Sequence, residues 1–238
     1  MKAIFKVQAI LFALFLGAIS TGCSLHDDEL MDITIPVSYL SIFHAAPTIN
    51  SMDIQIDDVK YNSQPFKYKN FSGYNTYEPG TRNFKFTPHG DATVLVDTSL
   101  NLSEEKTYSM FIFDDANQVT PLVIEDNWEI PTSGKAMIRL INLSYDAKAL
   151  DLHMDGQQEG LFKELKYKEV SQFKEIDAGR KHIILRDFVT DDIVAELTDA
   201  LIEESRIYTI IISGYIHTDN ESSNHIGMQL ITNHTILY

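Results

Sequence analysis

The sequence of 238 residues contains one cysteine, which excludes an intramolecular disulfide. Beyond the N-terminal region, no segment stays apolar for the roughly 18 residues that a membrane-spanning helix requires. Basic residues are also few, since 19 Lys and Arg stand against 34 Asp and Glu for a net charge of −15. This balance argues against nucleic acid and anionic lipid as partners, because both require a positive surface.

Enzyme motifs are missing as well. The sequence has no G-x-S-x-G, no H-E-x-x-H and no glycine-rich phosphate loop. We therefore expect a protein that is not an enzyme and has neither a cofactor nor a metal. An unrecognised hydrolase stays an alternative, because catalytic triads are defined by geometry and not by sequence order.

The N-terminus carries the pattern of an export signal. Lys2 and Lys6 are followed by an apolar run over 7–19 and by Ser20-Thr21-Gly22-Cys23, which predicts a signal peptide over 1–22. Its end resembles the lipobox of bacterial lipoproteins, although Ser20 stands where Leu is usual. We expect Cys23 to become a lipidated N-terminus bearing palmitate-type acyl chains, which together anchor a protein stably. The alternative is an ordinary signal peptide with an incidental cysteine.

Residues 23–35, which begin with Cys23, are polar and acidic, and this composition predicts a flexible tether. The acidic run over 24–29 resembles the surface-export signal of lipoproteins in one Gram-negative phylum. We therefore expect an outer-membrane lipoprotein exposed at the cell surface, or otherwise one that faces the periplasm. Loss of Lys2 and Lys6 with the signal leaves 17 basic against 34 acidic residues, a net charge of −17 for the mature chain.

From Val37 onward the pattern predicts short β-strands separated by turn residues. Apolar and polar residues alternate over 52–56, 83–87 and 150–154, which is typical of strands with one face buried and one in water. A helical period is not sustained anywhere after the signal. Residues 159–170 resemble a short helix, but their counterpart in the other half favours a strand.

The chain also repeats itself. Residues 44–58 align on 142–156, and 66–87 align on 165–186, so that Lys67-Tyr68-Lys69 recurs as Lys166-Tyr167-Lys168. This register predicts two tandem immunoglobulin-like antiparallel β-sandwich modules, over 36–127 and 136–238, joined by a linker over 128–135. A barrel stays an alternative to each sandwich.

The openings of both halves resemble a known family. His44-Ala45-Ala46-Pro47, with the strand pattern over 52–57, resembles the opening of the family called domain of unknown function 4397 (DUF4397), and 141–156 resembles a diverged copy of it. Residues 77–81 and 176–180 resemble the glycine turn of that family. The resemblance implies extracellular, often tandem, immunoglobulin-like modules without an established activity.

Several side chains are candidates for a site. Because the counterpart of His44 is Asn142, we expect His44 to satisfy turn backbone groups rather than to bind a ligand. Asp53 and Asp57 lie about 13 Å apart along one strand, too far to share a calcium ion. We expect them and Asp58 to form a solvated face and a turn, with Asp114, Asp115, Asp191 and Asp192 as weaker loop candidates.

The segment over 61–77 is rich in aromatic residues, which a sugar-binding platform would use. Four of them align with apolar residues of the second half that are mostly aliphatic, so we expect core positions. These are Phe66, Phe71, Tyr74 and Tyr77, aligned with Leu165, Val170, Phe173 and Ile176.

The second half contains a longer polar loop over 214–225, which we treat as a speculative binding loop. Its candidate residues are His217, Asp219, Asn220, Glu221 and His225. Their spacing fits no known metal motif, so the simpler reading is disorder. Trp128, in the join between the halves, is expected to pack one module against the other.

The sequence thus predicts a non-enzymatic, lipid-anchored envelope protein for extracellular binding or adhesion. Two alternatives stay open, a glycan-capturing accessory lipoprotein and a structural module of an envelope complex. The expected partners are the membrane, through the lipid, and an unknown protein or glycan ligand.

Overall fold

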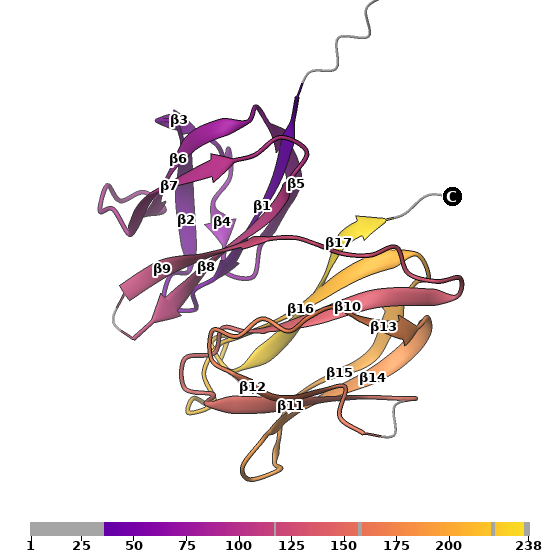
Figure 1. Cartoon of the computed structure of the whole chain (residues 1–238). Helices are drawn as coiled ribbons and strands as arrows, with labels where there is room; N and C mark the ends of the chain where they lie inside the picture. The colour runs from indigo at the N-terminus through magenta and orange to yellow at the C-terminus, as the bar shows by residue number, and fades with distance from the viewer. Residues whose placement is uncertain (1–35, 117, 157–158, 220–221, 236–238) are drawn as a thin grey trace, which may run out of the picture. The chain divides into compact units, whose positions relative to one another are not determined.

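The computed structural model describes residues 36–116, 118–156, 159–219 and 222–235, and these contain strands and turns but no helix (Figure 1). The all-β prediction is confirmed. The predicted signal peptide, Cys23 and the tether lie outside the described residues. In the described part of the chain, no helix could cross a membrane.

The first module contains nine strands in two sheets. One sheet has the order β5-β1-β8-β9, and the other has the order β3-β2-β6-β7 with β4 beside β2. The strands are β1 (Ser38–Ala45), β2 (Ser51–Ile56), β3 (Val59–Lys60), β4 (Phe66–Lys67), β5 (Phe71–Tyr77), β6 (Gly80–Pro88), β7 (Val96–Leu102), β8 (Thr107–Asp115) and β9 (Gln118–Glu125).

The second module repeats this plan with eight strands. Its sheets have the orders β13-β10-β16-β17 and β12-β11-β14-β15, and no strand described in this module corresponds to β3. The strands are β10 (Lys135–Asn142), β11 (Ala149–Met154), β12 (Phe162–Lys166), β13 (Lys174–Asp177), β14 (Gly179–Asp187), β15 (Ile193–Ile202), β16 (Arg206–Ser213) and β17 (Gly227–Thr235). The strand expected within 159–170 is therefore present as β12.

The sheets differ from the antiparallel expectation in one pairing per module. β1 pairs with β8 in parallel, and β10 pairs with β16 in parallel, whereas the other ladders are antiparallel. The first strand of each module lies between an early and a late strand of the same sheet. Whether this first strand runs parallel or antiparallel to the late strand depends on the path of the chain between the two strands. The alternation of residues within one strand contains no information about that path.

Each module has its own hydrophobic core between its two sheets. Leu40, Met52 and Phe84 are fully buried in the first core, and Ile138, Leu152 and Ile210 are fully buried in the second. In β2 and β11 the alternate residues Asp53 and His153 point out of these cores, as the sequence pattern predicts.

Backbone conformation follows the repeat. Gly80 and Gly179 both open their strands with φ near +125°, a value that favours glycine. Positive φ also recurs at matched places in equivalent turns, mostly at residues other than glycine. These pairs are Lys69 with Lys168, Glu105 with Ser205, and Asp58 with Gly156.

The segment between the modules is short and packed. β9 ends at Glu125 and β10 begins at Lys135, so the strand takes the last residue of the predicted linker. Asp126 is buried and Trp128 is half-buried. The described residues from Pro36 onward belong to one compact unit, so this segment is not a free spacer.

Candidate inter-module binding site

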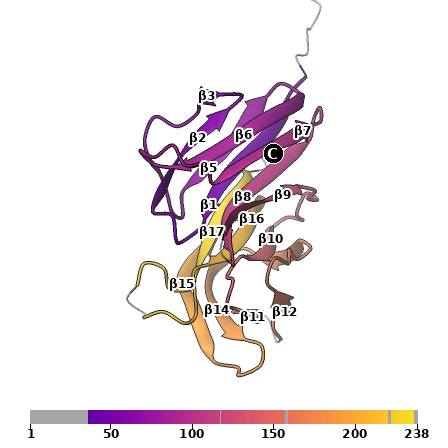
Figure 2. The ribbon, with the colours of Figure 1, turned by 90° about the vertical axis from the view of Figure 1, so that its left-hand side faces the viewer.

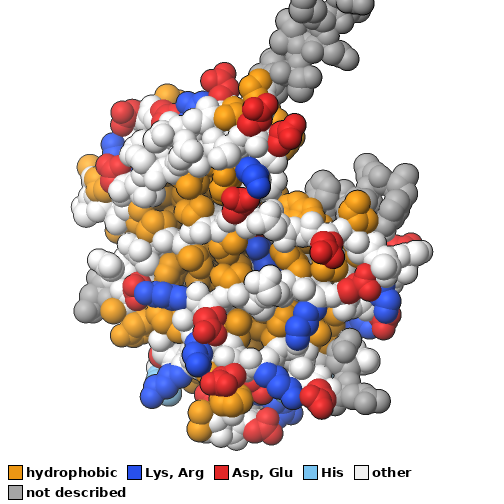
Figure 3. All heavy atoms as spheres, viewed as in Figure 1, with side chains coloured by type: hydrophobic (Ala, Val, Ile, Leu, Met, Phe, Trp, Pro, Cys, Tyr) orange, Lys and Arg blue, Asp and Glu red, His pale blue; other side chains and the backbone are white. Residues whose placement is uncertain are grey.

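The two modules meet through the outer faces of two sheets. Phe43 on β1 and Phe111 on β8 point away from the first core and form a third hydrophobic cluster with Ile141 and Ile211 of the second module. On the view in Figure 3, hydrophobic side chains gather where the modules meet, and Figure 2 shows β8 and β16 between the outer sheets. The central sheets are therefore buried on both faces.

This second buried face was not predicted, although the sequence contains its signal. Residues 108–113 and 207–212 are nearly continuous apolar runs and do not alternate. Continuous runs are typical of strands covered on both faces. The clean alternation that predicts one face in water occurs only in the outer sheets.

The repeated Lys-Tyr-Lys motifs reach across this interface from opposite modules. The Tyr68 hydroxyl lies 3.0 Å from Ser213 Oγ at the end of β16, and burial raises its pKa to about 12. In the equivalent contact, the Tyr167 hydroxyl donates to the Asp114 carbonyl oxygen at 2.9 Å, at the end of β8. Each motif thus connects its module to the other.

The lysines that follow these tyrosines differ in their partners. Lys168 Nζ forms an ion pair of 2.6 Å with Asp115 of the first module. The position equivalent to Asp115 in the second module is Tyr215, whose hydroxyl instead donates to Asp114 Oδ2 at 2.7 Å. Lys69 makes no ion pair with any described residue, and its ammonium lies 5.1 Å from the centre of the Tyr68 ring.

Lys69 borders a pocket of about 520 Å³ between the modules. Partial desolvation by the pocket walls lowers the pKa of Lys69. The volume is within the range of small-molecule sites in proteins. The lining residues are Pro47, Thr48, Asn50, Lys67, Tyr68 and Lys69 of the first module and Ser223 and Asn224 of the second.

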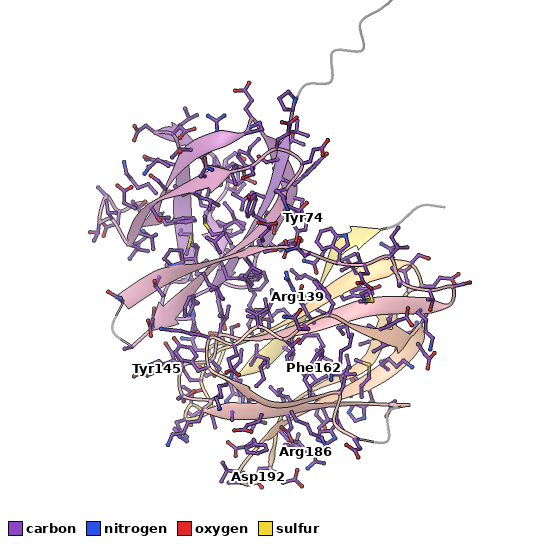
Figure 4. The ribbon with its side chains drawn as sticks, viewed as in Figure 1. Tyr74, Arg139, Tyr145, Phe162, Arg186 and Asp192 are labelled. Atoms are coloured by element: carbon purple, nitrogen blue, oxygen red, sulfur yellow. The ribbon has the colours of Figure 1, made fainter. Side chains whose placement is uncertain are left out.

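A buried polar network connects the modules at another place. Arg139 on β10 pairs with Asp126 at 2.5 Å, and both side chains are almost fully buried. The Tyr74 and Ser109 hydroxyls also donate to Asp126 Oδ2, at 2.8 and 2.7 Å. Arg139 Nε donates to Thr209 Oγ1. Tyr74 and Arg139 lie close together in Figure 4, and every charge in this group has a partner.

Trp128 packs between the modules, as predicted. Its ring forms edge contacts with Tyr74 of the first module and Phe173 of the second, with centroid distances of 6.4 Å in both. The Arg139 guanidinium lies 4.8 Å from the centre of the Phe173 ring. The segment after β9 therefore contributes Asp126 to the buried network and Trp128 to the packing beside it.

His44 and Asn142 satisfy the same turn, as predicted. His44 Nδ1 accepts from the Ala46 N–H, and Asn142 Oδ1 accepts from the Ser144 N–H. Burial lowers the pKa of His44 to about 4, although the nearby Ile49 backbone opposes this shift. The imidazole is therefore neutral at physiological pH.

The candidate aspartates other than Asp114 and Asp115 have structural roles through their side chains or backbone. Asp53 contacts Lys60 and His89, Asp57 accepts from the Asn83 backbone, and Asp58 pairs with Lys85. In the second module, the Asp191 carbonyl accepts from Arg186, and Asp192 closes the same hairpin turn (Figure 4). Among the described residues, no three acidic, histidine or cysteine side chains gather as they would around a metal ion.

The aromatic segment does not form a solvent-exposed platform. Phe66 lies in the first core, Phe71 packs against the inter-module cluster, and Tyr77 packs against the first core. The Tyr74 hydroxyl belongs to the buried network, and burial raises the pKa of Tyr74. This finding contradicts the aromatic-platform form of the glycan hypothesis and confirms the predicted packing role.

The speculative binding loop is partly described. Asn220 and Glu221 lie outside the described residues. The His217 backbone N–H donates to Asp146, the Asp219 carbonyl accepts from Ser222, and His225 Nδ1 lies 3.4 Å from Thr218 Oγ1. The contact of His217 is thus made by its backbone, and Ser223 and Asn224 of the same loop line the pocket. A binding role for the loop residues stays a prediction.

Solved structures with some likeness to the chain include carbohydrate-binding proteins and a putative adhesin from Bacteroides ovatus, the latter with 9% identity over 84% of this chain and 95% of its own and a TM-score of 0.22. An alpha-glucan-binding streptococcal virulence factor has 10% identity over 73% of this chain and 92% of its own, with a TM-score of 0.25. A family 26 module of Amy13K from Eubacterium rectale, in complex with maltoheptaose, has 10% identity over 81% and 96%, with a TM-score of 0.26. At these TM-scores the likeness carries no argument about this chain.

No curated protein matches the sequence. A family model described as domain of unknown function (DUF4397) matches residues 38–153, from the start of β1 to the end region of β11. The matched segment contains the His44 opening and the glycine turn at Gly80. Residues 38–153 therefore match the DUF4397 family, as the opening motif predicts.

Proposed function

We propose that this protein is a non-enzymatic, lipid-anchored envelope protein that binds an extracellular ligand in the pocket between its modules. The observation that carries the proposal is the pocket itself, which both modules line and which buried contacts hold in place. Among the described residues, its lining contains hydroxyl, amide and ammonium groups but no carboxylate and no histidine. Such a lining suits binding better than acid–base catalysis, which needs a group that titrates near neutral pH.

Anchoring through Cys23 in the outer membrane, with the modules facing outward, is part of the same proposal. It is supported by the signal pattern over 1–22 and by the acidic run after the cysteine. A lipid anchor would hold the pocket at the membrane surface, where an extracellular ligand is accessible.

The lipid anchor is tested by growing cells with an alkyne-bearing palmitate and detecting label on the protein. We expect label on the natural sequence and none on Cys23→Ser, since the thiol accepts the first acyl-bearing group. Protease treatment of intact cells then reports orientation. Unlabelled protein of natural sequence, or full protection from protease, would contradict the anchor or the outward orientation respectively.

One observation favours a structural role in an envelope complex. Phe188, Val189 and Ile193 are exposed around the hairpin between β14 and β15, with Val189 81% exposed. Exposed apolar side chains that lie together are typical of protein contacts. In this second candidate function the hairpin, and not the pocket, would hold the partner.

Affinity capture from cross-linked cells separates the two functions. The bait is the full chain, compared with Asn50→Trp, which fills the pocket, and with Val189→Ser, which makes the hairpin more polar. We expect a captured ligand to be lost with Asn50→Trp and kept with Val189→Ser. The reverse pattern would overturn the binding proposal and support the structural one.

A further inference from the structure

We propose that Lys69 recognises the anionic group of an acidic sugar unit in the pocket between the modules. This inference rests on the proposed binding function and names the ligand class of the same site. It depends on three features of the described residues: a lysine without an ion pair, a lining whose other residues apart from Lys67 and Pro47 are neutral and polar, and a strongly acidic surrounding chain.

The first feature is a break in the repeat. Lys69 and Lys168 stand at equivalent positions and share a positive φ of 69° and 67°. Lys168 has its carboxylate partner, Asp115, across the interface. At the equivalent place Tyr215 replaces the carboxylate, so Lys69 is left facing the pocket without a counter-charge from the described residues.

The carboxylate of Asp114, next to Asp115 in the sequence, already accepts hydrogen bonds from other residues. Asp114 accepts from the Thr48 backbone N–H, the Thr48 hydroxyl and the Tyr215 hydroxyl, at 3.0, 2.7 and 2.7 Å. These three bonds stabilise its charge without Lys69. An anionic ligand would therefore supply the charge-assisted hydrogen bond that Asp115 supplies to Lys168.

The remaining lining favours a sugar. The Asn50 side-chain amide makes no hydrogen bond with another described residue, and Ser223 bonds only to the neighbouring Asn224 side chain. Amides and hydroxyls both donate and accept, as sugar hydroxyls do. The Tyr68 ring is not a free stacking surface, because Lys69 lies over it and His44 packs against it at 5.9 Å. Recognition would thus rely on hydrogen bonds and charge.

The net charge limits the size of the anion. The predicted mature chain carries 17 basic and 34 acidic residues, so a long polyanion would meet repulsion over most of the surface. At physiological ionic strength this repulsion is screened beyond roughly 8 Å. A single carboxylate-bearing sugar unit can therefore bind Lys69 without the cost that a polyanion would meet.

The test uses the predicted mature chain, with Cys23→Ser in place of the lipid, and titration by ligand-observed NMR. The probes are glucuronate, galacturonate and N-acetylneuraminate, with glucose and inorganic phosphate for comparison. We expect at least one acidic sugar to bind at least about tenfold more tightly than glucose, which lacks the charge whose bond contributes about 1.5–3 kcal/mol. We also expect it to bind more tightly than phosphate, which lacks the ring hydroxyls that the amides and hydroxyls of the lining would bond.

The variants are Lys69→Gln and the matched Lys168→Gln, which removes the equivalent charge on the other side of the interface. We expect Lys69→Gln to weaken acidic-sugar binding about tenfold or more and Lys168→Gln to change it less than twofold. Cooperative thermal unfolding of both variants, with midpoints within about 4 °C of the parent, shows that the fold around the pocket is intact.

The outcomes separate the inference from the function on which it rests. Equal binding of glucose, equal binding of phosphate, or no effect of Lys69→Gln would overturn the inference. If none of the sugars binds but cell capture still yields a ligand that Asn50→Trp loses, the sugar assignment fails and the binding function stands. If capture also fails to depend on Asn50, both are overturned.

Discussion

His44 and Asn142 occupy the same turn in the two modules, and each accepts one backbone N–H, but His44 Nε2 has no hydrogen-bond partner among the described residues. Asn142 Nδ2 also donates to the carbonyls of Ala147 and Leu165. His44 can donate from only one ring nitrogen, and it packs against Phe66 instead. The difference matters for pH, because imidazole titrates near neutrality and an amide does not.

The lowered pKa of His44 predicts acid sensitivity. An unfolded His titrates near 6.5, whereas the folded pKa is about 4, so the unfolded chain binds the extra proton first. Stability is fully present above pH 6.5 and falls as the pH drops toward 4, by about 3 kcal/mol in total. Urea unfolding across this range measures the loss.

His44→Asn is the matched variant, because Asn142 shows that asparagine fits the equivalent turn. Some packing on Phe66 is lost at all pH values. The part of the pH dependence between 4 and 6.5 that His44 causes should disappear. A variant whose unfolding free energy follows the same slope as the parent would assign the acid sensitivity to other groups.

The pair of Asp126 and Arg139 gives a second prediction. Asp126→Ala leaves Arg139 buried without its anion and should cost about 3–5 kcal/mol. Adding Arg139→Met removes the orphaned charge, so the double variant should lose less than the sum of the two single variants. The measurement is a double-mutant cycle by urea unfolding.

Lys168→Gln is the control for this cycle. Its ion pair with Asp115 is partly exposed, so its loss should cost at most about 1 kcal/mol. Strict additivity of the Asp126 and Arg139 variants would show that the two side chains do not depend on each other, contrary to the structure.

Four strands differ from the others because other side chains cover both of their faces. They are β1, β8, β10 and β16. β8 places Met110 in the first core and Phe111 in the inter-module cluster, and both side chains are almost fully buried. Each sheet that contains these strands therefore has one face in a module core and the other face in the inter-module cluster. Strands of the outer sheets, such as β2 and β11, have one core face and one polar face.

Both modules also share an irregular pairing in the first strand. Ser72 Oγ accepts from the Ile42 N–H at 2.8 Å, and Ser171 Oγ accepts from the Leu140 N–H at 2.9 Å. In the first module the register of β1 and β5 shifts at this point. A hydroxyl thus replaces a ladder carbonyl and keeps the backbone N–H paired. The serines at equivalent positions 72 and 171 are the sequence signal for this irregular pairing.

Across residues 36–235, the inter-module cluster and the buried network predict that the two cores unfold together. We expect a single calorimetric transition for the predicted mature chain. Phe111→Asp places a charge in the cluster while leaving both module cores in place, and an unpaired buried charge is costly. It should divide the transition into two, because each core would then unfold separately.

Val59→Asp is the control for this experiment, since Val59 is 69% exposed on β3. It should leave the single transition and its midpoint nearly unchanged. Two transitions in the parent protein, or a single one in Phe111→Asp, would show that the interface does not couple the modules.

The sequence by itself determined the local structure of this protein. Alternation over 52–56 and 150–154, and the repeated Ser72 and Gly80, act through neighbours on one strand or one turn, so they predict strands, cores and equivalent turns. The presence of Asn142 at the position equivalent to His44 likewise predicts that both side chains bond to backbone groups of a turn.

Only the tertiary structure decided what lies between the modules. The interface depends on which outer faces meet, and strand alternation describes one sheet at a time. The lysines at 69 and 168 look the same in the sequence. They differ because Asp115, far away along the chain, forms an ion pair with Lys168 across the interface, whereas Tyr215 stands at the equivalent position of the second module.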